Sequence, residues 1–236
     1  LWKMGSGKCL IGWKTGVMPL FGILKAFNRQ PQNGFNIWEI RQQMSSNFSL
    51  IEEVGQFQTL IKKIEFTIRD GSSLECEKGI QKNLEMLEKL RDGGGNLFLV
   101  GNGGSAGVVS HILTDFINVN KLNARTLHES TLISCMSNDY GYENSFSEPL
   151  STLSKEKDLL IAVSSSGRSA NIRNAVKSMK EAGGYAITLS GFSKDNPLRS
   201  MGDLNVWLDS NSYGLVEIGH LFYLHYLSGR LKSKGL

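Results

Sequence analysis

Cysteine is scarce in this chain of 236 residues, which contains only Cys9, Cys76 and Cys135. Three cysteines without metal-type spacing argue against a disulfide framework and favour a reducing compartment such as the cytoplasm. Long apolar runs are missing too, since no uninterrupted stretch reaches the roughly 20 residues that a membrane-spanning helix needs. We therefore expect a cytoplasmic location and no membrane partner.

Net charge is also small, at +4, and it comes from one end of the chain. Residues 1–43 contain six Lys or Arg side chains and one acid, Glu39, whereas the remainder contains 20 basic and 21 acidic residues. A nearly neutral main domain gives no support for nucleic-acid binding. We expect no nucleic-acid partner.

Residues 1–43 lack the long periodic pattern that is found further on. Their scattered Trp and Lys residues suggest poor order without a partner, so we expect an extension of unknown role. Met44 is a candidate for the functional start, in which case the preceding residues come from an over-long gene model. The predicted domain covers residues 44–236.

Helical and strand patterns alternate from Met44 onward. Two amphipathic segments, 47–69 and 74–91, predict an N-terminal helical hairpin, which the RDGGG sequence at 91–95 ends. Five short apolar runs then predict strands, with helical segments between them. The predicted strands are NLFLV (96–100), ARTL (124–127), DLLIAV (158–163), YAITLS (185–190) and LNVWL (204–208).

This alternation is typical of an α/β domain whose parallel sheet is covered by helices on both faces. Five strands fit one doubly wound domain. Ligands of such domains bind beyond the carboxyl ends of the strands, so the loops at those ends are the candidate site.

A glycine loop, GNGGS at 101–105, follows the first predicted strand and precedes a helix. Glycines let backbone N–H groups approach an anion, and the helix N-terminus favours negative charge. The loop also satisfies a loose dinucleotide fingerprint through Gly101, Gly103 and Ala106. That alternative needs an acid after the next strand, where Glu129 lies, and it stays open at this point.

A serine loop, SSSGRSAN at 164–171, follows the third predicted strand and precedes another helix. One serine is enough to cap a helix, yet this N-terminus has four hydroxyls. They belong to Ser164, Ser165, Ser166 and Ser169. Hydroxyls and free N–H groups together suit a phosphate monoester. Two anion-friendly loops favour a sugar phosphate over a dinucleotide, and we expect no nucleotide cofactor.

Four ionisable residues occur as two pairs on two predicted helices. His111 and Asp115 are four residues apart and share one helix face. Glu217 and His225 lie eight residues apart on the last helix, a rotation of about 80°. The set could bind a divalent metal, or it could supply the acid and base of an aldose–ketose isomerisation. His220 points about 140° away from His225 and is expected to make a packing or partner contact.

Four motifs occur in this order: GNGGS (101–105), SNDYGYE (137–143), SSSGRSAN (164–171) and SYGLVEIGHLFYLH (212–225). From about residue 47 to 234 the chain resembles the phosphoheptose isomerases of the sugar-isomerase (SIS) domain family. The resemblance implies a flavodoxin-like sheet and a homotetramer with active sites across subunit interfaces. It also implies conversion of sedoheptulose 7-phosphate to D-glycero-D-manno-heptose 7-phosphate, the first step toward nucleotide-activated heptoses.

The resemblance also implies roles for individual residues. The implied substrate-binding residues are Asn102, Gly103, Gly104, Ser105, Asn138, Asp139, Ser164, Ser165, Ser166, Ser169 and Glu217. His111 matches a zinc ligand, and His225 matches the histidine that is both acid and ligand. Asp115 matches a glutamate that is both base and ligand, and Glu217 matches a glutamine ligand. The implied cofactor is one zinc ion per subunit.

Two of these positions depart from the family pattern. Asp115 is one methylene shorter than the family's glutamate, which withdraws the carboxylate by roughly 1.5 Å. Glu217 adds a negative charge where the family has a neutral amide. The main alternative is a non-catalytic SIS protein, similar to the initiator-associating protein that binds the replication initiator DnaA. That protein lacks the isomerase acid and base, whereas this chain has His225 and a carboxylate at position 115.

Overall fold

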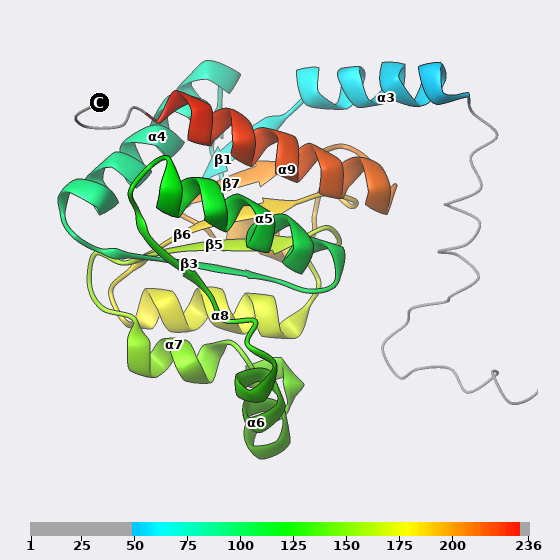
Figure 1. The fold of residues 1–236 in the computed structure, drawn as a ribbon. Helices are drawn as coiled ribbons and strands as arrows, with labels where there is room; N and C mark the ends of the chain where they lie inside the picture. The colour runs from blue at the N-terminus through cyan, green and yellow to red at the C-terminus, as the bar shows by residue number, and fades with distance from the viewer. Residues whose placement is uncertain (1–48, 232–236) are drawn as a thin grey trace, which may run out of the picture. The chain divides into compact units, whose positions relative to one another are not determined.

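The computed structural model describes residues 49–231, and the predicted extension over residues 1–43 lies outside the described residues. The described chain forms one seven-stranded sheet in the order β2-β1-β7-β6-β5-β3-β4, with helices against both faces (Figure 1). The strands are β1 (Glu65–Ile68), β2 (Ser73–Leu74), β3 (Asn96–Gly101), β4 (Asn123–Thr126), β5 (Leu159–Ser164), β6 (Tyr185–Ser190) and β7 (Leu204–Trp207).

Helices precede the first strand, follow the last strand and occupy most of the connections between the strands. They are α3 (Leu50–Lys62), α4 (Cys76–Asp92), α5 (Gly104–Asn118), α6 (Ser130–Tyr140), α7 (Ser147–Leu153), α8 (Ala170–Glu181) and α9 (Tyr213–Arg230), with 3-10 turns η1 (Tyr142–Asn144) and η2 (Pro197–Ser200). Among these described helices, none is long and apolar enough to cross a membrane.

The five predicted strands are confirmed, each within one residue of its expected bounds. They pair in parallel, and their spatial order in chain numbering is 2-1-3-4-5, the flavodoxin-like arrangement. The strand order reverses between β3 and β5. This switch point is where a doubly wound sheet opens a crevice at its carboxyl edge.

The sheet is buried on both faces because its central strands are continuous apolar runs. All six residues of β5 are buried. One face packs against Leu87 of α4, Ile112 of α5 and Leu224 of α9. The opposite face packs against α8, which contributes Val176, and α7 packs on α8 with Leu150 in the same apolar cluster (Figure 1). Each fully buried side chain of this size contributes about 1.5–3 kcal/mol, so the two layers hold the loops of the carboxyl edge in place.

The predicted N-terminal helical hairpin is wrong in part, because a strand separates its two helices. α3 ends at Lys62, and β1 then pairs antiparallel with β7. Phe66 of β1 is buried against Tyr223, with 5.8 Å between ring centroids. Glu65–Ile68 continue the amphipathic pattern of α3, and so short a pattern does not distinguish a helix from a strand. These residues form a strand because they pair with the edge of β7 that the parallel strands leave free.

Candidate active site

The glycine loop joins β3 to α5 at the switch point of the sheet. Gly103 has a φ of +53°, which side chains rarely adopt. A Cβ on Gly101 would lie 2.6 Å from backbone atoms of Ser105, and a Cβ on Gly104 would overlap the Glu217 carboxylate. The turn therefore needs its three glycines, and it brings the first turn of α5 against α9.

Asn102, in the middle of the glycine loop, connects it to the serine loop. Its side chain and that of Asn171 exchange two hydrogen bonds of 2.9 Å. The Tyr142 hydroxyl donates a third, also of 2.9 Å, to Asn102 Oδ1. Sequence reasoning gave no role to Asn171 or Tyr142, although both lie inside motifs that it singled out. The network fixes the distance between the two loops.

The serine loop joins β5 to α8 on the other side of the switch point. Ser164 and Ser165 are buried, and Ser165 Oγ has no hydrogen-bond partner among the described residues. Ser166 Oγ accepts the Arg168 N–H at 3.3 Å. Ser169 occupies the N-cap of α8 but makes no capping hydrogen bond. A buried hydroxyl without a partner, next to an uncapped helix start, suits a bound anion.

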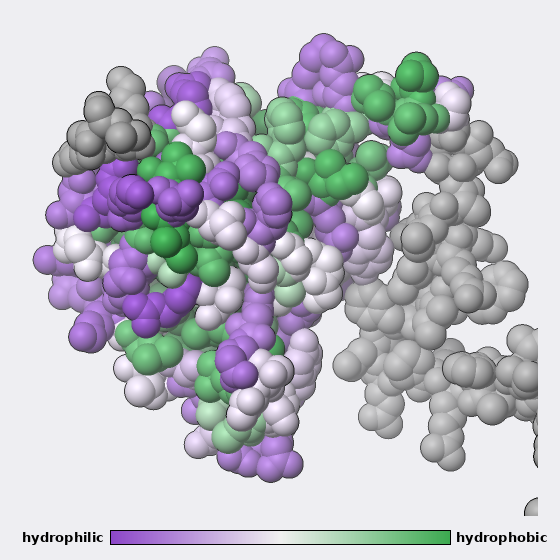
Figure 2. All heavy atoms as spheres, viewed as in Figure 1, coloured by the Kyte–Doolittle hydropathy of each residue, from purple (hydrophilic) through white to green (hydrophobic). Residues whose placement is uncertain are grey.

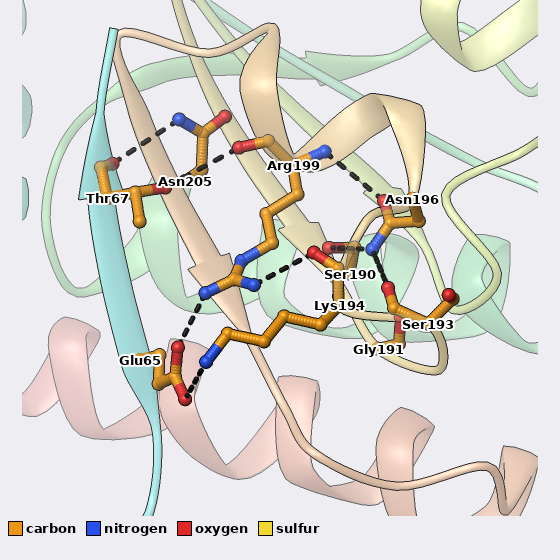
Figure 3. A network of polar contacts seen from close by, with 9 residues as sticks. All are labelled: Glu65, Thr67, Ser190, Gly191, Ser193, Lys194, Asn196, Arg199 and Asn205. Carbon is orange, nitrogen blue, oxygen red and sulfur yellow. Dashed lines mark hydrogen bonds and ion pairs between the residues drawn. The ribbon is translucent and has the colours of Figure 1, made fainter. Parts of the chain in front are cut away.

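Asn196 supports the serine loop from the outside. Gly167 has a φ of +63°, and a Cβ on it would overlap the Asn196 side chain. Asn196 Nδ2 donates to Ser190 Oγ and to the backbone oxygens of Gly191 and Ser193, at 2.9–3.2 Å (Figure 3). A side chain held by three hydrogen bonds cannot move aside, so the loop is pinned at Gly167.

β1, one of the two strands that the sequence prediction missed, supports this segment. Arg199 of η2 lies 2.6 Å from Glu65 of β1 (Figure 3). Its guanidinium also lies 4.5 Å from the ring centroid of Trp207. Lys194 reaches the other Glu65 oxygen at 3.2 Å. β1 therefore holds the segment that carries Asn196, and through it the serine loop.

Asp115 of α5 and His225 of α9 are in direct contact. Asp115 Oδ2 lies 2.9 Å from His225 Nδ1, and the two side chains are 31% and 39% exposed. An ionised carboxylate only accepts hydrogen bonds, so the imidazole N–H donates. His111 packs edge-on against His225, with 5.0 Å between centroids. Three of the four predicted ionisable residues thus meet where α5 and α9 pack side by side (Figure 1).

Glu217 lies apart from this group, in the first turns of α9 against Gly104. Burial raises the pKa of its carboxyl. Along α9 it is about 12 Å from His225. In the described part of the chain, no group of three or more His, Cys, Asp or Glu side chains is arranged to hold a metal ion. One chain therefore does not bring the four predicted zinc ligands to one point.

Asn138 and Asp139 lie exposed on α6, away from the regular layers. Asn138 Nδ2 donates to Asp139 Oδ1 at 2.8 Å, and the Cys135 thiol donates to Asp139 Oδ2 at 3.5 Å. Within the described residues, no hydrogen bond joins them to the glycine or serine loop. Only Tyr142, two residues beyond α6, reaches that network.

His128 and Glu129 both make hydrogen bonds that support the fold. His128 Nε2 accepts the Gly101 N–H at 3.2 Å, and burial lowers its pKa, so the neutral ring supports the glycine loop. Glu129 accepts the Leu132 N–H at 2.7 Å and caps α6. Glu129, the acid that the dinucleotide-binding alternative requires, is thus engaged in capping α6. His220 is fully buried, which confirms a packing role.

Comparison with known proteins places this geometry in a family. The SIS domain model matches residues 67–191, more than half of the chain. A phosphoheptose isomerase of Geotalea daltonii is 26% identical over 204 residues, which cover 84% of this chain and 96% of that protein. Phosphoheptose isomerase 1 of Campylobacter jejuni is 31% identical over 160 residues, covering 65% of this chain and 86% of the relative.

A solved phosphoheptose isomerase of Neisseria gonorrhoeae shares the fold. Its TM-score is 0.67 at 22% identity, and the alignment covers 78% of this chain and 98% of that one. The similarity therefore extends from the four motifs to the whole sheet and its helices. The chain belongs to the SIS domain family and, within it, to the phosphoheptose isomerases.

Proposed function

We propose that this protein is an aldose–ketose isomerase that converts sedoheptulose 7-phosphate to D-glycero-D-manno-heptose 7-phosphate, for the synthesis of nucleotide-activated heptoses. The contact between Asp115 and His225 is the observation that carries the proposal. A carboxylate and an imidazole in hydrogen-bond contact are the base and the acid that this chemistry needs. The names of its relatives point to the same substrate class.

The reaction moves two protons and needs no net oxidation. Asp115 takes a proton from carbon 1 of the ketose, next to the carbonyl, while His225 protonates the carbonyl oxygen at carbon 2. The resulting enediol collapses when carbon 2 regains a proton and the hydroxyl at carbon 1 loses one, which leaves the aldehyde. Such acid–base assistance is worth roughly 10²–10⁴ in rate.

The serine loop is the proposed phosphate site. Its hydroxyls and the start of α8 supply hydrogen-bond donors to a monoester, and the partnerless Ser165 hydroxyl supports this assignment. The phosphate-binding residues are Ser164, Ser165, Ser166 and Ser169, with the buried Ser105 nearby on α5.

The glycine loop is the proposed site for the sugar hydroxyls. Asn102, Gly103 and Gly104 form its turn, and the Glu217 carboxyl lies against Gly104. Burial raises the pKa of the Glu217 carboxyl, which is proposed to form a hydrogen bond with a sugar hydroxyl. Asn138 and Asp139 of α6 are further proposed contacts to the sugar.

The distance along α5 suggests that one site is built from two chains. Asp115 lies about three turns from Gly104, roughly 16 Å along the helix axis. An extended heptose 7-phosphate measures only ~10 Å from carbon 1 to phosphorus. A sugar whose phosphate lies in the serine loop of one chain is therefore better placed to meet the Asp115–His225 pair of another.

A homotetramer with interface sites provides this arrangement. The faces of α3 and α9 expose large apolar side chains, which Figure 2 shows in green along α3. They include Leu50, Ile51, Val54, Ile218 and Phe222, each at least 49% exposed. Contiguous apolar surface of this kind marks an interface, and a second copy of the chain is the occupant that the distance argument requires.

Zinc is the proposed cofactor. His111, Asp115 and His225 provide nitrogen and oxygen donors that zinc accepts, and zinc would act as a Lewis acid toward a carbonyl. However, the hydrogen bond between Asp115 and His225 uses two of those donor atoms, and Glu217 lies elsewhere. We therefore derive no catalytic step that depends on the metal.

The test is incubation of the purified protein with sedoheptulose 7-phosphate, with and without a chelator, followed by NMR. We expect resonances of an aldoheptose 7-phosphate, and the chelator arm reports whether activity needs a metal. A correctly assembled protein that binds the sugar phosphate but never turns it over would contradict the proposal and favour a non-catalytic SIS regulator.

A further inference from the structure

A cavity lies at the edge of the sheet opposite the candidate active site, at the amino ends of the parallel strands. It has a volume of about 680 Å³. Leu159 and Tyr185, the first residues of β5 and β6, form part of its lining, and Lys82 and Lys89 of α4 form another part. Sites of 300–1,000 Å³ accommodate small molecules and cofactors. The proposed isomerase reaction gives this cavity no role.

Four cationic side chains line the cavity, together with two carboxylates. Arg69, Lys82, Lys89 and Lys157 all border it. Of the ion pairs formed by the described residues, none includes any of these four. Four cations against the two carboxylates of the lining, Asp70 and Asp203, leave an excess of positive charge around one concave surface, which raises the local concentration of anions.

The two acids in the lining are already engaged. Asp70 Oδ1 accepts the Ser72 N–H at 2.8 Å. Asp203 Oδ2 accepts the Ala186 N–H at 2.9 Å, and its other oxygen lies 3.9 Å from Lys180 Nζ. Burial, the larger cause, and the charge of Arg69 act together to lower the pKa of Lys180, while Asp203 opposes them. These contacts leave the two carboxylates charged, but the four cations of the lining outnumber them, so the lining has a net positive charge.

The remaining lining is apolar. Ile68, Met86, Leu90 and Leu159 contribute aliphatic and thioether surface, and Tyr185 adds an aromatic ring that is 53% exposed. Apolar walls with a few charged groups are typical of sites for amphipathic ligands. A small inorganic anion would leave this surface uncovered.

The cavity is distinct from the substrate site. β5 runs from Leu159 in the cavity to Ser164 in the serine loop. Five residues of extended strand span roughly 16 Å, and the packed sheet lies between the two ends. A ligand of the cavity does not reach the serine loop.

We propose that this cavity binds an aromatic phosphate of the nucleoside diphosphate class. The base and ribose cover the apolar lining and Tyr185, and the diphosphate pairs with the cations of α4 and with Arg69 and Lys157. The ligand occupies the cavity independently of the sugar phosphate.

Isothermal titration calorimetry with ADP tests the proposal on the full-length protein without sugar phosphate. We expect saturable ADP binding, at least tenfold tighter than that of adenosine or inorganic pyrophosphate. Adenosine lacks the diphosphate that pairs with the cations, and pyrophosphate lacks the base and ribose that cover the apolar lining. Absence of saturable ADP binding up to millimolar concentration overturns the proposal. Pyrophosphate binding as tight as ADP binding also overturns it, because the apolar lining then contributes nothing.

Variants on α4 locate the site. Lys82→Ala with Lys89→Ala should weaken ADP binding at least tenfold, whereas Lys78→Ala, on the same helix outside the lining, should leave it unchanged. Sedoheptulose 7-phosphate should not displace ADP. Displacement, or equal effects of Lys78→Ala and the double variant, would contradict the assignment. Because binding is measured directly, a failure of the isomerase proposal leaves this result interpretable.

Discussion

The Asp115–His225 contact concentrates the proposed chemistry in two side chains. Both are partly exposed, and neither belongs to the buried core. Their removal should therefore affect turnover much more than folding. The same reasoning applies to the serine loop, where Ser165 has a hydroxyl that no described residue satisfies.

The first prediction concerns the acid and the base. His225→Ala and Asp115→Asn should each lower kcat by about 10²–10⁴, with a melting temperature close to that of the unchanged protein. Glu85→Gln, which removes one exposed acid of α4, is the matched control and should leave kcat unchanged. Steady-state kinetics and thermal unfolding check this prediction. A normal kcat in either variant refutes the assigned roles.

The second prediction concerns the phosphate. Ser165→Ala combined with Ser166→Ala should raise KM about 10–100-fold, because each hydrogen bond to a charged group is worth about 1.5–3 kcal/mol and partial compensation is expected. Ser151→Ala on α7, which removes an exposed hydroxyl that bonds only its own helix, should not change KM. An unchanged KM in the double variant would remove the serine loop from the site.

At the scale of elements, loops supported by neighbouring segments position these residues. Gly167 shows the dependence most clearly, since its left-handed backbone leaves no room for a Cβ beside Asn196. Three hydrogen bonds hold Asn196, and the pairing of β1 with β7 holds the segment that carries it. The shape of the serine loop is thus decided by residues distant in sequence.

The third prediction tests this support. Gly167→Ala should destabilise the protein by about 1–3 kcal/mol and raise KM, since the loop must shift to relieve the overlap. Gly107→Ala is the control, because no heavy atom lies within 4 Å of its added Cβ and alanine favours the helix interior. Chemical unfolding and kinetics measure both effects. Equal behaviour of the two variants would show that the overlap is relieved without cost.

The sequence predicts most of the elements but little of their mutual support. Five apolar runs predict the parallel strands because each is long enough to be buried on both faces. β1 is missed because Glu65–Ile68 continues the pattern of α3, and only its pairing with β7 makes it a strand. Spacing placed Asp115 and His225 on helices, but it could not show that Glu217 lies against Gly104, which depends on how α5 and α9 pack.

At the scale of the whole molecule, one buried histidine links stability to pH. His220 Nε2 donates to Ser190 O at 3.1 Å, and burial lowers the pKa of His220 from 6.5 to about 4. The folded protein therefore resists protonation of His220, whereas the unfolded chain accepts it below about pH 6.5. The contribution of neutral, buried His220 to the free energy of unfolding is therefore fully present above pH 6.5 and is lost as the pH falls toward 4.

The fourth prediction follows from this loss of stability at low pH. Between pH 7 and pH 4 the free energy of unfolding should fall by about 2–4 kcal/mol through His220 alone. In His220→Gln, which keeps a donor for Ser190 O, the fall should be smaller by that amount. Urea unfolding at fixed protein concentration measures it. Parallel pH profiles for the two proteins would rule out His220 as the source.

In the proposed assembly, a second copy of the chain completes the site. Asp115 lies roughly 16 Å along α5 from Gly104, farther than the ~10 Å of an extended heptose 7-phosphate, and we propose that the exposed apolar side chains of α3 and α9 contact a second copy. If one chain supplies the phosphate site and another supplies the acid and base, an assembly that contains two different inactive chains can regain isomerase activity.

Complementation between such chains tests this account most directly. His225→Ala chains and Ser165→Ala/Ser166→Ala chains are co-expressed with different tags, and mixed assemblies are isolated. They are then assayed with sedoheptulose 7-phosphate well below the KM of the unchanged protein. The account predicts that about a quarter of the sites combine an intact serine loop with an intact acid–base pair, so aldoheptose 7-phosphate forms well above the level of either parent. Activity no greater than the sum of the two parents would contradict it.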